Sequence, residues 1–241
     1  TSVTLAAALA RHHGRKTLLL DMDPQGHVAS SLSTQFRPGA VGLSSVLAED
    51  SSVDLVDVAF ATDATNLHIV SPDDGLAALE QLLTSRIGKE GVLRDALVTA
   101  RTHYDVILLD CPPHVGNLTL NALVAADQVL IPCDLSPLAV EGVRSLIETM
   151  STVSERLNPR LDLLGIVVTR FDARNQGMND AVHEELRALY GDVVFPDPIG
   201  INTDLAKAQR AGKNIFDHAP QSRGAAHHQR LAYAVVSRLF T

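Results

Sequence analysis

The run from Asp105 to Pro132, DVILLDCPPHVGNLTLNALVAADQVLIP, decides the fold. It begins with the apolar segment DVILL, closed by Asp110, continues through a helical segment at 118–126, and returns to a second apolar segment, QVLIP. Both apolar segments are continuous rather than alternating, which is typical of strands buried on both faces of a parallel sheet. A strand, a helix and a strand in this order predict an α/β protein.

The same alternation of strands and helices continues along the rest of the chain. Apolar runs predict strands at 17–20, 67–70, 161–169 and 192–195, and helical periods predict helices at 76–83, 92–101, 137–157, 179–190 and 225–239. With 241 residues, 46% hydrophobic content and no Trp, the chain suits one aliphatic core. We therefore expect a single domain over 1–241, with a doubly wound, mostly parallel sheet flanked by helices.

Composition narrows the classes of function. The net charge of −8 argues against a protein that binds polyanions over its whole surface. The two cysteines, Cys111 and Cys133, give no disulfide framework, and we expect a reducing cytoplasm. No apolar run approaches the roughly 20 residues of a membrane span, and no signal peptide is visible.

Four loops at one predicted sheet edge carry the polar residues that a nucleotide site needs. Ligands of such sheets bind outside the carboxyl ends of the strands. The loops that follow the strands there read DMDPQG, DCPPHVG, PCDLSP and TRFDARN. Their Asp, Gly, Pro and Asn residues predict a nucleotide site at this edge.

Asp110 closes four apolar residues. An aspartate in this position can hold Mg²⁺ directly or through water, as a Walker B carboxylate does. The alternative is a plain helix N-cap or turn aspartate. Pro112 and Pro113, two residues later, stiffen the loop and lack backbone donors.

Asp21 and Asp23 stand two residues apart at the end of the first strand. Residues at this spacing can share one side of an extended chain. Asp23 would then orient a water towards a γ-phosphate, while Asp21 supports the outer shell of the metal. The alternative is an Asx turn before Pro24, and Gln25 and Gly26 suit either interpretation.

Positive charge gathers at the end of the chain. The segment 201–241 has a net charge of +4, so the other 200 residues carry −12. A local positive surface predicts a contact with nucleic-acid phosphates, whereas a solvated helix face is an equally good interpretation. The cations are Lys207, Arg210, Lys213, Arg223, Arg230 and Arg238, against the acids Asp204 and Asp217.

Together these motifs resemble one family. The set DMDPQGHVASSL, DVILLDCPPHVGNLTLNALVAADQVLIP, GIVVTRFDARN and APQSRGAA resembles the ParA/Soj family of partition ATPases, within the deviant Walker A group that includes MinD. The resemblance implies a P-loop NTPase-like fold and a cytoplasmic, nucleoid-associated ATPase that uses ATP and Mg²⁺. It also implies an ATP-bound homodimer, DNA binding without sequence preference, a ParB/Spo0J-like activator protein and no membrane contact.

The resemblance also assigns residues. Asp23 matches the catalytic, water-positioning aspartate, and Asp110 and Asp21 match the aspartates at Mg²⁺. The residues that it places at the nucleotide are Asp21, Gln25, Gly26, Pro112, Pro113, Arg170 and Asp172. Those that it places at DNA are Lys207, Arg210, Lys213 and Arg223.

Three departures from the family pattern affect these expectations. The phosphate loop KGGVGKT is absent, and alignment of TLAAALA puts Thr1 just after it. We therefore expect an N-terminally incomplete chain, without the first strand and the phosphate loop. This chain should bind and hydrolyse ATP poorly, and the ATPase activity should belong to the full-length parent. The family's Pro-Arg-Asn-Val-Arg reads Gly-Ile-Asn-Thr-Asp at 200–204, which puts DNA binding in question. Phe171 and Asp172 stand where Tyr-Asp is usual.

Other functions stay open at this point. A ParA-like positioner of non-DNA cargo would share most of these motifs. A MinD-like membrane-surface switch would need a basic amphipathic tail beyond the last helix. An iron–sulfur reductase of the same superfamily would need paired cysteine ligands, and Cys111 and Cys133 do not form such a motif.

Overall fold

Two small sheets form the centre of the protein. In the computed structural model, which describes residues 1–172, 174 and 176–240, the strand orders are β2-β3-β1-β4 and β5-β6-β7. The pairings are parallel except for β2 with β3, which is antiparallel. The strands are β1 (Thr17–Asp21), β2 (Phe60–Ala61), β3 (Leu67–Val70), β4 (Val106–Asp110), β5 (Gln128–Asp134), β6 (Asp162–Phe171) and β7 (Ile199–Gly200). The predicted α/β class with a mostly parallel sheet is confirmed.

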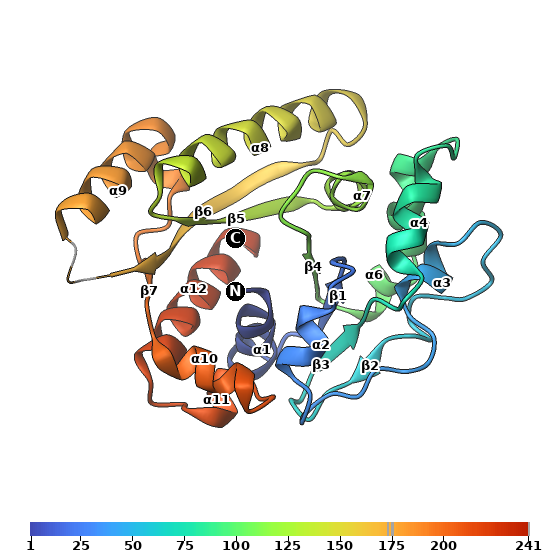
Figure 1. Ribbon diagram of the computed structural model, residues 1–241, viewed down its shortest axis with the longest axis horizontal. Coiled ribbons are helices and arrows are strands. Elements are labelled where there is room, and N and C mark those ends of the chain that lie inside the picture. Colours follow the sequence, from blue (N-terminus) through green and yellow to red (C-terminus); the bar gives the residue numbers. More distant parts are fainter. Residues whose placement is uncertain (173, 175, 241) are drawn as a thin grey trace.

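Helices cover both faces of these sheets (Figure 1). Those before β5 are α1 (Ser2–His13), α2 (His27–Ser31), α3 (Leu43–Leu47), α4 (Leu76–Leu83), α5 (Val92–Ala96), α6 (Ala100–His103) and α7 (Asn117–Ala125). Those after it are α8 (Pro137–Arg156), α9 (Gln176–Tyr190), α10 (Thr203–Arg210), α11 (Ile215–His218) and α12 (Arg223–Leu239). Short 3₁₀ turns lie at η1 (Lys89–Gly91) and η2 (Gly191–Val193).

The strands are buried on both faces, as their continuous apolar sequences predict. On β1, Leu19 packs into a core built by α1, α10, α11 and α12, whereas Leu18 and Leu20 pack into a second core beneath α3–α7. On β6, Val167 joins the first core, and Ile166 and Val168 face a third core beneath α8 and α9. One face of both sheets is thus covered by a single group of helices.

That shared face is built around α1 and α12. The two helices pack against each other, and Figure 1 shows them side by side between the two sheets, with the labelled termini close together. α1 also contacts β1, β3 and β4 of the first sheet, and α12 contacts β6 and β7 of the second. The helices therefore connect the two sheets on this face.

The structure differs from the sequence prediction in three segments. The strand expected at 192–195 is wrong, because η2 fills its start and only Val194 forms an isolated bridge, to Ile166. The helix expected at 92–101 is divided into α5 and α6, and the break falls at the β-branched pair Val98–Thr99, which disfavours helix. The expected single sheet is divided in two, because β4 pairs only with β1 and β5 only with β6 within the described residues.

Candidate functional site

Asp21 and Asp110 share one edge of the first sheet. β1 and β4 are parallel neighbours, and their register pairs Asp21 with Asp110 as the last residue of each strand. Parallel strands end at the same edge, so both carboxylates lie where ligands of such sheets bind. The sequence prediction that these two residues lie together is confirmed.

Asp21 is wholly enclosed and organises the loop that follows it. Its Oδ1 accepts a hydrogen bond from the backbone N–H of Asp23 at 3.1 Å, and its Oδ2 accepts one from Val28 at 3.1 Å. Burial raises the pKa of Asp21 to about 6, even though these two amide donors act in the opposite direction. With both oxygens engaged by the backbone, Asp21 suits a supporting position behind a metal rather than a direct bond to it.

Asp23 forms the Asx turn before Pro24 that the sequence analysis gave as the alternative to a catalytic role. Its Oδ1 accepts a hydrogen bond from the backbone N–H of Gln25 at 3.0 Å, which is an Asx turn over Pro24. The Asp23 carbonyl then accepts from Gly26, whose φ of 64° lies in the left-handed region that favours glycine. The turn fixes the direction of Asp23, which is only partly buried. An Asx turn and a water-positioning role are compatible, because the turn uses Oδ1.

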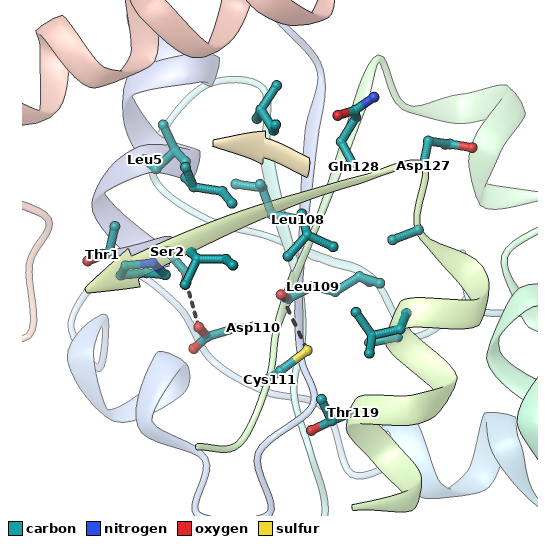
Figure 2. Close-up of a pocket in the computed structure, with 18 of the residues that line it drawn as sticks. Thr1, Ser2, Leu5, Leu108, Leu109, Asp110, Cys111, Thr119, Asp127 and Gln128 are labelled. Atoms are coloured by element: carbon teal, nitrogen blue, oxygen red, sulfur yellow. Dashed lines mark hydrogen bonds between the residues drawn. The ribbon is translucent and has the colours of Figure 1, made fainter. Parts of the chain in front are cut away.

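Asp110 has a neighbour that sequence reasoning missed. The hydroxyl of Ser2, the first residue of α1, donates to Asp110 Oδ1 at 2.5 Å (Figure 2). α1 therefore begins at the carboxyl edge of β4, with the positive end of its dipole directed towards this carboxylate. The position of Ser2 at the start of a helix gave no signal of this contact, which depends on how α1 packs across the sheet.

A cavity of about 1020 Å³ lies between the open edges of β4 and β5. Figure 2 shows Thr1, Ser2 and Asp110 towards one end of it and Asp127 and Gln128 towards the other. Its walls are mostly apolar side chains of β4, β5, α7, α8 and α12. The end with Thr1, Ser2 and Asp110 is the one that lies at the carboxyl edge of β4.

The loop after β4 contributes to the same end of the cavity. Pro112 and Pro113 line it together with Asp110, Pro112 being buried and Pro113 exposed. Desolvation raises the pKa of the Cys111 thiol to about 12, and the neighbouring Asp110 adds to the shift. A thiol with so high a pKa is protonated at neutral pH and is therefore a poor nucleophile.

Arg170 and Asp172 lie at the end of β6, in the second sheet. Arg170 is exposed and has a positive φ of 56°. The Asp172 carboxylate accepts from Arg174 Nε at 3.0 Å and from Nη2 at 2.9 Å, and these bonds lower the pKa of Asp172. Neither residue is among the described residues that line the cavity. Their assignment to the nucleotide therefore stays a prediction.

The predicted DNA-binding residues lie on α10, in the loop after it, and at the start of α12. Arg210, Lys213 and Arg223 are exposed, and no carboxylate of the described chain lies within ion-pair distance of them. Lys207 differs, because its ammonium pairs with Asp204 at 3.1 Å. Asp204, which stands where the family motif has an arginine, thus neutralises part of the positive charge that Lys207 would offer.

The start of α12 packs closely on the start of α10. A Cβ built on Gly224 would stand 3.0 Å from the Leu205 side chain and 3.2 Å from that of Asn202. Arg223, the residue before Gly224, therefore lies beside the start of α10. The structure brings these cations to one region of the molecule.

Two further classes of site have no support in the described chain. Over residues 1–172, 174 and 176–240, no three His, Cys, Asp or Glu side chains are grouped so as to hold a metal ion by themselves. In the same part of the chain, none of the helices has the length and apolar character needed to span a bilayer.

Comparisons with known proteins identify the family. The AAA domain family model matches residues 1–163. The sporulation initiation inhibitor protein Soj of Bacillus subtilis is 37% identical over 98% of this chain and 92% of its own length. The chromosome-partitioning ATPase Soj of Thermus thermophilus is 39% identical over 99% of this chain and 90% of its own. A solved cobyrinic acid a,c-diamide synthase from Mycobacterium smegmatis, with bound ATP analogue and magnesium, is 30% identical with a TM-score of 0.84, and covers 100% of this chain and 89% of that one.

These matches do not support one of the sequence predictions, which concerns the phosphate loop. The predicted loss of the phosphate loop is not borne out by these matches. The poor ATPase activity expected of this chain is not tested by them. The family resemblance itself is confirmed by sequence identity and by fold. The chain belongs to the ParA/Soj family of partition ATPases.

Proposed function

We propose that this protein is a DNA-partition ATPase that binds and hydrolyses ATP with Mg²⁺ at the carboxylate edge of the first sheet. The observation that carries the proposal is the register of Asp21 with Asp110 at the ends of two parallel strands. The relatives named above add weight, because one is a chromosome-partitioning ATPase and a solved neighbour holds an ATP analogue and magnesium.

The residues present fit Mg²⁺. Asp110 and the Ser2 hydroxyl offer hard oxygen donors within 2.5 Å of each other, which is the ligand chemistry that Mg²⁺ prefers. Mg²⁺ in nucleotide sites typically binds one or two carboxylates, with phosphates and waters completing the shell. A site without three grouped carboxylates is therefore adequate for it.

Each carboxylate then has a separate task. Asp110 would hold the metal, which supplies charge neutralisation at the phosphates when bound. Asp21 holds the loop through its bonds to Asp23 and Val28, and so positions the next carboxylate. Asp23, with Oδ1 engaged in the Asx turn, would orient the attacking water through Oδ2.

DNA binding is the second part of the proposal. Arg210, Lys213 and Arg223 form an exposed positive surface, which we name the basic surface, on a protein whose net charge is −8. Phosphate contacts of this kind bind DNA without reading its sequence. The ATP-bound homodimer and the ParB/Spo0J-like activator belong to the proposal on the strength of the family resemblance.

The experiment measures ATP binding, ATP hydrolysis and DNA affinity of the protein. We expect Mg²⁺-dependent, saturable ATP binding that Asp110→Ala weakens by about tenfold or more. We also expect that DNA affinity falls with salt and that Arg210→Glu with Lys213→Glu removes most of it. The matched control is Arg144→Glu with Arg187→Glu, the same charge change on exposed residues of α8 and α9. An absence of Mg²⁺-dependent ATP binding would falsify the proposed ATPase activity. Equal DNA affinities of the two double variants would exclude the basic surface as the DNA-binding site.

A further inference from the structure

The segment that follows α2 is bound to the loop between α10 and α11. Thr34 donates to the Gly212 carbonyl twice, from its backbone N–H at 3.1 Å and from its hydroxyl at 2.7 Å. Gly212 has a φ of 63°, and a Cβ built on it would stand 2.4 Å from Ser33 Oγ. The two loops therefore contact each other so closely that neither can shift without the other.

Gln35 makes the most specific part of this contact. Its Oε1 accepts from the backbone N–H of Asn214 at 2.7 Å and from Asn214 Nδ2 at 3.0 Å, while its Nε2 donates to Asp217 Oδ2 at 2.7 Å. One side-chain amide thus uses both its acceptor and its donor on α11 and its N-cap. Asp217 is also paired with Arg11 of α1, so the far side of this contact is anchored on the core.

A short path leads from Gln35 back to the carboxylate edge. Asp21 Oδ2 binds the N–H of Val28 in the first turn of α2, and α2 ends at Ser31, four residues before Gln35. Val28 and Leu32 are buried in the core that α1 and α12 share with these loops. α2 is thus fixed to Asp21 at its start, and the residues after its end are fixed to the loop 211–214. We therefore expect a displacement of the loop 21–26 to move residues 34 and 35 as well.

The other end of the path lies within the basic surface. Arg210 is the last residue of α10, and Lys213 precedes Asn214, whose backbone N–H Gln35 binds. The position of the loop 211–214 is thus set by Thr34 and Gln35 rather than by α10 alone. Whatever moves α2 also moves the two cations.

We propose that Gln35 is a positioning residue that couples the nucleotide loop 21–26 to the affinity of the basic surface for DNA. This inference rests on the proposed function, and it assigns the coupling to one named contact. Coupling of two ligands is reciprocal, so ATP would raise DNA affinity by the same factor by which DNA raises ATP affinity. Gln35 would contribute to both factors equally, without touching either ligand.

The test is Gln35→Glu. This nearly isosteric change keeps an acceptor for Asn214 but replaces the donor to Asp217 with a carboxylate oxygen, so like charges meet. We measure DNA affinity with and without ATP, ATP affinity with and without DNA, and Tm. We expect both coupling factors to fall by about fivefold or more, with ATP affinity in the absence of DNA unchanged. The control is Gln81→Glu, the same change on an exposed residue of α4.

A rescue variant separates coupling from general damage. Asp217→Asn added to Gln35→Glu restores a donor opposite the new acceptor, and we expect it to recover the coupling factor. If Gln35→Glu does not fold, Thr34→Val removes the hydroxyl bond to Gly212 with little change of shape, and the same fall is expected. Unchanged coupling factors in the folded variant overturn the role of Gln35 while leaving the proposed function intact. A wild-type protein whose DNA affinity does not change with ATP also overturns the coupling, whereas only a protein without Mg²⁺-dependent ATP binding overturns the proposed ATPase.

Discussion

Asp21 and Asp110 occupy equivalent positions at the ends of neighbouring strands, yet their surroundings differ. The oxygens of Asp21 are taken up by two backbone amides, and burial raises its pKa to about 6. Asp110 instead accepts a hydrogen bond from the Ser2 hydroxyl of α1 and lines an open cavity. One carboxylate shapes the loop and the other faces the cavity, which explains why two aspartates at one edge are not redundant.

The role of Asp23 leads to a kinetic prediction. Asp23→Ala removes the carboxylate that would orient water, so hydrolysis should slow by about 100-fold, while ATP binding, which needs Asp110, persists. Phosphate release and nucleotide binding are measured side by side. Asp57→Ala, at an exposed acid, should leave both unchanged. Hydrolysis at the wild-type rate in Asp23→Ala would contradict the assignment.

Arg238 joins α12 to the second sheet. Its guanidinium donates to the carbonyls of Leu164, Val193 and Asp192 at 2.6–3.1 Å and stacks over the Phe195 ring at 3.9 Å. Arg238→Ala leaves three carbonyls without this partner, so the free energy of unfolding should fall by about 2 kcal/mol.

Urea denaturation measures this loss. Arg230→Ala is the matched control, because Arg230 lies on the same helix with one exposed partner, Asp197, at 3.7 Å. It should change the free energy of unfolding by less than about 0.5 kcal/mol. Equal losses in the two variants would mean that the contacts of Arg238 contribute nothing beyond those of a surface arginine.

His228 should make stability depend on pH. It is 3% exposed, and burial lowers its pKa from 6.5 to about 4, while its bond with the Gly224 carbonyl acts in the opposite direction. The folded state therefore binds the proton more weakly than the unfolded state. Its contribution is fully present above pH 6.5 and is lost as pH falls towards 4.

The loss is measurable by difference. Between pH 7.5 and pH 4.5 it amounts to about 2.5 kcal/mol of the free energy of unfolding. His228→Gln keeps a side-chain donor but cannot titrate. Over the same interval, the free energy of unfolding of this variant should therefore fall by about 2.5 kcal/mol less than that of the wild type. His218→Gln, at an exposed histidine, should follow the wild-type curve. A His228→Gln curve parallel to wild type would show that His228 does not titrate as described.

Asn121 ties α7 to the segment around η1. It is 1% exposed, its Oδ1 accepts from the Leu93 N–H at 3.1 Å, and its Nδ2 donates to the Lys89 carbonyl at 2.8 Å. Asn121→Ala leaves these buried groups unpaired, so the free energy of unfolding should fall by about 2 kcal/mol or more. Thermal and urea unfolding check this, with the exposed Gln81→Ala as control. A loss below about 0.5 kcal/mol would mean that water replaces the amide.

The sequence predicted the elements whose signal is local. The apolar run 67–70 and the helix 76–83 have the predicted bounds, because burial and helical period are read within a few residues. The pairing of Asp21 with Asp110 was also predictable, since parallel strands end at one edge. These features depend on the pattern rather than on distant contacts.

Contacts between distant segments could not be predicted in this way. Ser2 meets Asp110 across 108 positions and Gln35 meets Asn214 across 179, and neither pair has a distinctive residue type or spacing. α10 was also missed, because it is short and mostly polar, and Ala208 is the one residue of this helix that is buried. Such contacts follow from packing, which pattern alone does not specify.

The packing of α1 against α12 also determines when the protein can finish folding. These two helices are the first and last elements of the described chain, so their contact closes a loop of more than 200 residues. Contacts this remote in sequence form late and slow the overall rate. During synthesis, the apolar side of the sheets that α12 covers stays uncovered until that helix emerges from the ribosome, and we expect the nascent protein to be a substrate for chaperones during that interval.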